Sequence, residues 1–172
     1  MSKYIFTFVL LLLAAFSRIL PHPVNVAPIT AIALFAGVYL GRKYAFIIPI
    51  AAMFISDYFI GFYDEMIWVY LSFLMIGGIG LWLKNHRGIF TTVGASVTGS
   101  VLFFIVTNFG VWLSARMMYP HTWAGIAECY TAAIPFFRNT LIGDLCYVTA
   151  MFGIYEITTR VVPMFKLENK SA

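Results

Sequence analysis

The sequence predicts an all-α integral membrane protein, a six-helix bundle with both termini in the cytoplasm. Three observations predict this fold class. Of the 172 residues, 62% are hydrophobic and only 10% are charged, and the mean hydropathy is +0.89, so a soluble domain of this length could not bury the apolar surface. The apolar residues fall into six segments, most of them close to the length of about 20 residues that crosses a bilayer. The Lys and Arg residues gather at the ends of alternate segments, as the positive-inside rule expects.

The first three predicted helices are residues 4–20, 27–40 and 44–62. Pro21 and Pro23 end the first helix, because proline cannot continue a helix. The second helix is short and opens with Pro28, a residue that suits the first helical turn. The acidic pair Asp64-Glu65 follows the third helix and marks a polar loop.

The last three predicted helices are residues 66–83, 88–115 and 134–155. The fourth ends at a polar stretch that begins with Lys84 and closes with Arg87. A loop over residues 116–133 is expected between the fifth and sixth helices, and the sixth begins near Ile134-Pro135. The whole is one transmembrane domain, residues 1–165, followed by a polar C-terminal tail, residues 166–172.

The basic residues set the expected orientation. With the N-terminus inside, the cytoplasmic segments hold eight of the eleven Lys and Arg residues: Lys3, Arg42, Lys43, Lys84, Arg87, Arg160, Lys166 and Lys170. Arg18, Arg116 and Arg138 remain on the other side. Because cytoplasmic loops carry the excess of positive charge, both termini are predicted to be cytoplasmic.

The polar residues within the apolar segments gather toward the predicted outer face. They are Arg18, Asp57, Asn108, Arg138, Asn139 and Asp144. A charged side chain near the bilayer centre costs about 2.5–3.5 kcal/mol on insertion scales, so such residues usually line a cavity or pair with each other. Their position on one side predicts an outward-facing pocket for a small water-soluble molecule.

Helical spacing groups several of these residues. Thr140, Asp144, Tyr147 and Met151 follow three- and four-residue steps and share one face of the sixth helix. On the fifth helix, Asn108 and Trp112 share a face, and an aromatic ring one turn from an amide suits a flat polar ligand; Trp112 could instead be an interface anchor.

Three prolines stiffen the first outer segment, residues 21–28, which could act as a lid with His22 and Asn25 reaching inward. The same prolines could simply end one helix and start the next. The charged side chains could instead form ion pairs with each other. Arg138 would then pair with Asp57 or Glu128, and Asp144 would pair with Arg18.

A stripe of small residues, Ala33, Gly37 and Gly41, recurs every four positions on the second helix. Small residues let helix backbones approach closely in a membrane, where hydrophobic association between helices is absent. The stripe could serve packing within the bundle, or it could be the surface on which another membrane subunit docks. Both are possible on different faces.

Several function classes lack their motifs. The sequence contains no GxxxxGK[ST] loop, no HExxH and no GxSxG, and its three histidines lack metal-ligand spacing. We therefore expect no enzyme activity and no cofactor. The basic residues are scattered over loop ends rather than collected in a stripe, so no nucleic-acid partner is expected. Cys129, in the predicted outer loop, could be free, oxidised or a soft metal ligand.

Short motifs distributed along the chain carry a resemblance. They are Arg18-Ile19-Leu20-Pro21, Ala27-Pro28-Ile29, Ala33-Leu34-Phe35-Ala36-Gly37, Pro49, Ser56-Asp57 and Asn139-Thr140-Leu141-Ile142-Gly143-Asp144. Over residues 10–156 the chain resembles a family of small, functionally uncharacterised bacterial membrane proteins. That family is itself similar to the substrate-binding (S) components of energy-coupling factor (ECF) vitamin transporters.

The resemblance implies a six-helix S-component-like bundle in the bacterial plasma (inner) membrane, with an outward pocket under the first outer loop. A complete transporter would add a transmembrane coupling protein and two ATPase subunits. S components usually dock through small residues four apart on their first helix, whereas here Ala14 is followed by Arg18 and the stripe lies at Ala33, Gly37 and Gly41. Some S-like proteins act alone, and solitary cobalamin transporters use a cysteine as cobalt ligand, for which Cys129 is the outward candidate.

From these observations we expect a membrane transport protein that binds a vitamin or precursor from outside and delivers it to the cytoplasm. The expected substrate-binding residues are Arg18, Asn25, Asp57, Asn108, Trp112, Arg138, Asn139 and Asp144. Because arginines and carboxylates both occur, an amphoteric or amide-rich ligand fits better than a simple sugar. The alternative is a non-catalytic structural or assembly protein whose intramembrane charges only pair internally.

Overall fold

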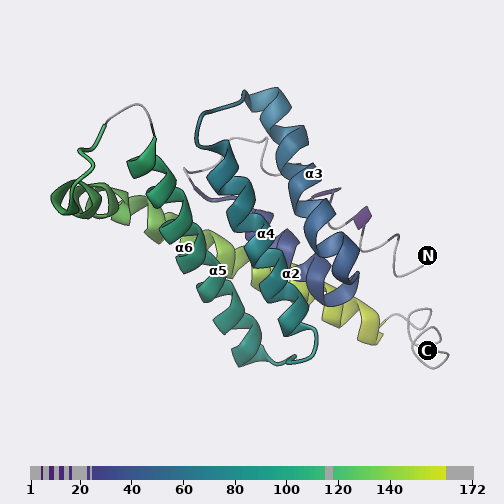
Figure 1. The fold of residues 1–172 in the computed structure, drawn as a ribbon. Helices are drawn as coiled ribbons and strands as arrows, with labels where there is room; N and C mark the ends of the chain where they lie inside the picture. Colours follow the sequence, from purple (N-terminus) through teal and green to yellow (C-terminus); the bar gives the residue numbers. More distant parts are fainter. Residues whose placement is uncertain are drawn as a thin grey trace.

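The structure is a computed structural model of the chain. It describes residues 25–114 and 118–161, together with Ile5, Phe8, Val9, Leu12, Leu13, Phe16 and Pro23. Within that part of the chain there are five helices and no strand: α2 (Ile29–Tyr39), α3 (Arg42–Ile60), α4 (Met66–Leu83), α5 (Ile89–Leu113) and α6 (Trp123–Val161). Figure 1 shows them packed side by side.

Four of these helices, α3 to α6, are long and apolar enough to cross a membrane. α4 has the predicted bounds, and α3 and α5 differ from theirs by about two residues at each end. α2, with 11 residues, rises about 16 Å and covers only about half of a hydrocarbon core roughly 30 Å thick. Most of the first predicted helix, including Ala14 and Arg18, lies outside the described residues.

α6 is longer than predicted. The expected loop over residues 116–133 is wrong for residues 123–133, which are helical. The Thr122 hydroxyl accepts a hydrogen bond from the Gly125 N–H (3.1 Å), which caps the start of the helix. Gly125, Cys129 and Ala133 then lie buried at steps of four residues. A capping threonine followed by small residues at steps of four indicates a helix. The turn residues just before it favoured a loop instead.

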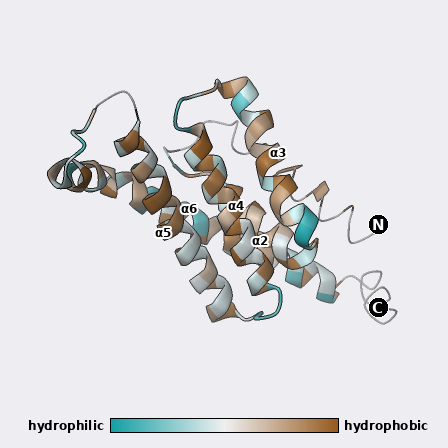
Figure 2. Ribbon diagram, viewed as in Figure 1, coloured by the Kyte–Doolittle hydropathy of each residue, from teal (hydrophilic) through white to brown (hydrophobic). Residues whose placement is uncertain are grey.

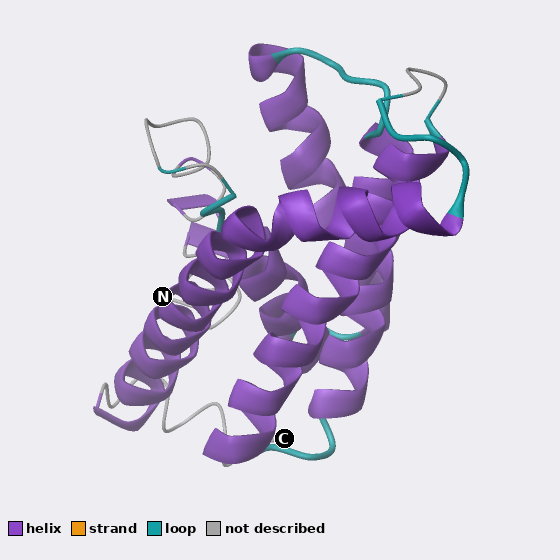
Figure 3. Cartoon of the chain, turned by 90° about the vertical axis from the view of Figure 1, so that its left-hand side faces the viewer, coloured by secondary structure: helices purple, strands orange, loops and turns teal. Residues whose placement is uncertain are grey.

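Pro135 lies inside α6 and does not begin it. In Figure 1 the first turns of α6 are seen end-on, whereas the rest of the helix crosses the view, and Figure 3 shows the same change of direction. A proline inside a helix removes one backbone hydrogen bond and bends the helix. With 39 residues, or about 58 Å if straight, α6 could not fit a bilayer upright, and the bend lets its first turns run across the end of the bundle.

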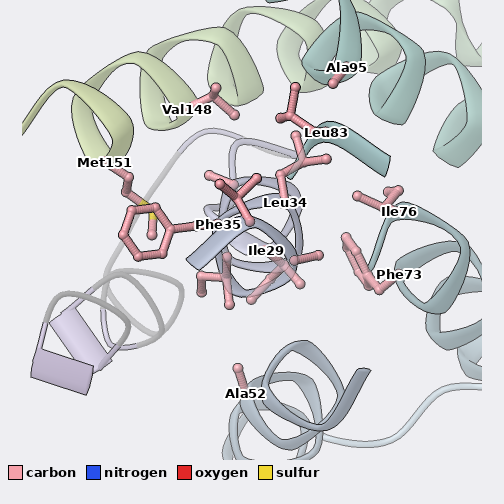
Figure 4. Close-up of a cluster of buried hydrophobic side chains, with 14 of the residues drawn as sticks. Ile29, Leu34, Phe35, Ala52, Phe73, Ile76, Leu83, Ala95, Val148 and Met151 are labelled. Carbon is pink, nitrogen blue, oxygen red and sulfur yellow. The ribbon is translucent and has the colours of Figure 1, made fainter. Parts of the chain in front are cut away.

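α2 is the centre of the core. Every residue from Ile29 to Val38 is buried, and α2 contacts each of the other four described helices. Figure 4 shows side chains from these helices surrounding Leu34 and Phe35. A helix that is apolar on all sides must be buried on all sides, so the shortest helix becomes the axis of the bundle.

The outer faces of the other helices are apolar as well. On α3, Phe54, Ile55, Tyr58 and Phe59 are exposed, and on α5 Phe90 is 92% exposed. Figure 2 shows hydrophobic residues along the outside of the long helices. A soluble monomer rarely exposes so large a continuous apolar surface, so the surface of the bundle fits a lipid environment.

The contact between α2 and α4 depends on glycine. A Cβ atom added to Gly37 would lie 2.6 Å from the carbonyl carbon of Gly80, and one added to Gly80 would lie 2.8 Å from the Leu34 carbonyl oxygen. The two backbones therefore touch directly. Ala33 and Gly37, two residues of the small-residue stripe, are buried in this contact and face α4 rather than a partner. Gly41 is the N-cap of α3 and has φ 91°, a conformation that favours glycine.

Two glycines of α4 provide a test of this contact. Gly80→Ala introduces a methyl group into the α2 backbone, and overpacking of this kind costs about 1–3 kcal/mol. Gly78→Ala is the matched control, since a Cβ there meets nothing within 4 Å, and alanine is the better helix former. We expect Gly80→Ala to lower the apparent melting temperature in detergent and Gly78→Ala to maintain or raise it. Equal melting temperatures for the two variants would contradict the direct backbone contact.

Candidate ligand-binding site

A cavity of two adjoining chambers lies at one end of the bundle. The lower chamber has a volume of about 290 Å³ and the upper one about 250 Å³. The chambers share five lining residues: Asn25, Tyr63, Val69, Phe103 and Thr140. Tyr63 belongs to the α3–α4 loop, which Figure 1 shows at the same end as the α5–α6 connection. The volumes approach the lower end of those found for small-molecule sites, about 300–1,000 Å³.

The position of the cavity follows from the short α2. Ala27, Ile29 and Thr30, at the start of α2, line the lower chamber. Because α2 is only about half as long as a membrane span, its longer neighbours wall the space beyond its N-terminus, and none of the helices α2 to α6 fills that space. At the opposite end, an Arg87 guanidinium N–H donates to the Val38 carbonyl oxygen (3.2 Å) and closes the bundle over the end of α2.

The segment before α2 reaches the cavity. Asn25 lines both chambers and has φ 63°, a left-handed conformation that asparagine tolerates better than most residues. Val26 packs on Gly143 of α6, where an added Cβ would lie 3.1 Å from a Val26 methyl group. Asn25 therefore forms part of the cavity wall, and His22 lies outside the described residues.

Asp144 lies at the deep end of the lower chamber. Its side chain is 2% exposed, and it lines the chamber together with Thr30 and Thr140. The Ser100 hydroxyl of α5 donates to Asp144 Oδ2 at 2.7 Å, and Thr30 at the start of α2 lines the same chamber. A hydrogen bond between α5 and α6 therefore holds this buried carboxylate in place.

The upper chamber is more aromatic. Phe104 and Phe137 pack with ring centroids 4.8 Å apart in its wall. Asn108 lines this chamber and donates from Nδ2 to the Phe104 carbonyl oxygen at 2.8 Å, which leaves its amide oxygen for another donor. Glu65, at the end of the α3–α4 loop, adds a second carboxylate. The cavity thus presents hydroxyl, amide and carboxylate groups among aromatic rings.

Other residues expected to bind substrate lie elsewhere. Trp112 is not among the lining residues; its indole N–H donates to the Pro120 carbonyl oxygen (3.1 Å), which ties α5 to the following connection. Arg138 is exposed on α6, and Asn139 is half-buried outside the cavity lining. Asp57 is fully buried and accepts a hydrogen bond from the Tyr70 hydroxyl at 3.0 Å. Arg18 lies outside the described residues.

Cys129 is buried in the first turns of α6, and its thiol donates to the Asn108 carbonyl oxygen at 3.5 Å. Over residues 25–114 and 118–161, no group of three His, Cys, Asp or Glu residues is arranged to hold a metal ion. The thiol therefore forms a hydrogen bond between α6 and α5 in this structure.

Several lining residues escaped the sequence reasoning. Thr30, Tyr63 and Glu65 line the cavity, but each stands in or beside an apolar segment without a motif. A signal existed for Thr140, which precedes Asp144 by one helical turn and faces the same way. The aromatic residues Phe103 and Phe104 could not be distinguished by sequence from rings that face lipid.

Residues 1–165 match a family described as "Family of unknown function (DUF6580)". The chain belongs to this family. The matched range covers all the helices described above. No curated protein and no solved structure matches the chain.

Two serines one turn apart on α5 test the anchoring of Asp144. Ser100→Ala removes the hydroxyl that donates to Asp144, and a hydrogen bond between membrane helices contributes about 0.6–1.7 kcal/mol. The Ser96 hydroxyl is buried without a hydrogen-bond partner in the described part of the chain, so Ser96→Ala is the matched control. We expect only Ser100→Ala to lower the apparent melting temperature; a larger loss for Ser96→Ala would contradict the assigned bonds.

Proposed function

We propose that this protein is a membrane transport protein that binds a small water-soluble micronutrient in an outward-facing cavity and delivers it to the cytoplasm. The observation that carries the proposal is the cavity over the N-terminus of α2, with the buried Asp144 carboxylate at its deep end. Packing of helices does not require such a space. Polar groups in an apolar bundle are costly, so a cavity that exposes several of them indicates a ligand.

The charges support an outward opening. Arg42 and Lys43, at the start of α3, and Lys84 and Arg87, after α4, lie at the end of the bundle opposite the cavity. Cytoplasmic ends of membrane proteins carry the excess of Lys and Arg. The cavity would therefore face the outside, and an arriving solute would meet Glu65 and Asn108 before Asp144.

The resemblance to S components of ECF transporters supports a route for delivery. In that arrangement a transmembrane coupling protein and two ATPases would drive release of the ligand inward, and a solitary S-like protein would do so alone. The docking surface for a coupling protein would involve residues other than Ala33 and Gly37, since both are buried against α4.

The structural alternative has its own support. Asp57 accepts a bond from the Tyr70 hydroxyl (3.0 Å), and Glu156 accepts one from the Tyr39 hydroxyl (2.6 Å). Such hydrogen bonds hold carboxylates inside the bundle without any ligand, as an assembly protein would require. The cavity distinguishes the two functions, because internal pairing predicts that no small molecule fills it.

The expected topology can be measured with single cysteines. In a Cys129→Ser, Cys146→Ser background, Asp64→Cys places a thiol in the α3–α4 loop and His86→Cys places one in the α4–α5 loop. We expect a membrane-impermeant maleimide to label the Asp64→Cys variant in intact cells and the His86→Cys variant only after permeabilisation. The reverse pattern would put the cavity on the cytoplasmic side and exclude capture from outside.

Ligand binding can be tested with two threonines of α6. Thr140 lines both chambers, whereas Thr149 is exposed on the same helix. Thr140→Leu fills the cavity with methyl groups, and Thr149→Leu makes the same change on the outside. Native mass spectrometry of the protein in mild detergent should show a small molecule bound to the parent and to Thr149→Leu, and a loss of at least about tenfold in occupancy for Thr140→Leu.

Either of two outcomes would overturn the transport proposal. A parent protein that carries no small molecule and takes up none from a cell extract would contradict the binding function. A stoichiometric membrane partner on such an empty protein would support the assembly function instead.

A further inference from the structure

The charged residues of the described part of the chain that line the cavity are of one sign. Asp144 lies in the lower chamber and Glu65 in the upper one, and the described lining residues of both include no Lys, Arg or His. Arg138, the described arginine of the outer part of α6, is exposed and lies outside the lining. The described walls therefore give the cavity a negative potential, which attracts cations and repels anions.

Within the described residues, no Lys or Arg side chain pairs with the Asp144 carboxylate. The carboxylate accepts a hydrogen bond from the neutral Ser100 hydroxyl. In the described part of the chain the ion pair within 4 Å joins Arg160 and Glu156, which are remote from the cavity. Thr30 is the second residue of α2, so the carboxylate lies beside a helix N-terminus, whose partial charge of roughly +0.5 offsets only part of a full negative charge.

Aromatic rings surround the same space. Phe73 and Phe103 line the lower chamber, with ring centroids 5.3 Å apart, and Phe104 and Phe137 line the upper one. The face of an aromatic ring carries a negative partial charge and attracts organic cations, an arrangement that recurs in sites for quaternary ammonium groups. A buried carboxylate with aromatic walls is thus a combination suited to a bulky, weakly hydrated cation.

A bare metal ion fits this environment poorly. Calcium takes six to eight oxygen ligands and magnesium near-octahedral coordination, commonly with more than one carboxylate. The described lining of the lower chamber offers one carboxylate, with two threonines, Asn25 and Tyr63 as its other polar residues. The described residues include no cluster of three potential metal ligands. A volume of about 290 Å³ also exceeds what a single ion needs and fits a small organic molecule.

We infer that the cavity selects a small organic cation, with the Asp144 carboxylate as its counter-charge and the rings of the chamber walls around it. This inference rests on the proposed binding function and narrows its ligand class. It differs from the expectation of an amphoteric or amide-rich ligand, which rested on Arg18 and Arg138 together with the carboxylates. Arg138 lies outside the cavity lining, and Arg18 lies outside the described residues.

Two pairs of soluble probes test the inference by changing charge while largely preserving shape. Choline is compared with 3,3-dimethylbutan-1-ol, its uncharged isostere, and 1-methylnicotinamide with uncharged nicotinamide. Binding of each to the purified full chain in mild detergent is measured by isothermal titration calorimetry. We expect at least one cation to bind, and its neutral counterpart to bind at least about tenfold more weakly.

Two carboxylates of α6 provide the variants. Asp144→Asn removes the proposed counter-charge and should weaken cation binding at least about tenfold while preserving the melting temperature. Glu156→Gln is the matched control: Glu156 accepts a hydroxyl hydrogen bond from Tyr39, as Asp144 does from Ser100, but lies outside the cavity lining. This control should keep the cation affinity within about twofold. If the Asp144→Asn variant unfolds, the comparison of charged and neutral probes on the parent protein still tests whether the cavity prefers a cation.

The outcomes separate this inference from the proposed function. If neither cation binds, or if the neutral probes bind as tightly, the cation inference is wrong. If an anionic or uncharged ligand co-purifies and is lost in Thr140→Leu, the binding function stands while the cation inference fails. If no small molecule binds the parent at all, both fail together.

Discussion

The direct backbone contact between Gly37 of α2 and Gly80 of α4 is the constraint on which the other contacts depend. In a membrane, close packing and not hydrophobic burial holds helices together. Glycine at both positions lets the short α2 sit at the centre, where α3, α5 and α6 can also reach it. A larger residue on either side would push α2 outward and leave its apolar surface, buried from Ile29 to Val38, without partners.

A central helix of half the usual length has a functional consequence. α2 fills only part of the bundle, so its N-terminus, at Ile29 and Thr30, opens on a cavity instead of lipid or water. The same N-terminus stabilises negative charge, and Asp144 occupies that position with a bond from Ser100. The architecture that buries α2 thus also creates the space and places a carboxylate in it. The cavity and the core are two results of one packing arrangement.

The candidate site could be predicted in part. Asn108 and Asp144 were expected from the cost of polar groups in apolar segments, Asn25 was expected from the proline-rich segment before α2, and each lines the cavity. The cost of polar groups also selected Asp57, Arg138 and Asn139, which lie outside the lining. The cost of placing a polar residue in a membrane segment identifies unusual residues, but it does not tell which way their side chains point. That depends on which face of each helix the neighbouring helices cover. The bend at Pro135 and the early start of α6 change that coverage, and residue spacing within one segment cannot reveal it.

The sequence by itself determined the class of protein. Apolar segments of membrane-spanning length, the bounds of α4 and the approximate bounds of α3 and α5 follow from composition and from local stop signals, since hydrophobicity and turn residues act over short distances. Only the tertiary structure decided that the stripe of Ala33 and Gly37 packs inside the bundle, that α6 begins at Trp123, and that Asp144 shares a cavity with Thr30 and Tyr63. These features join residues far apart in the chain, and long-range packing places them together.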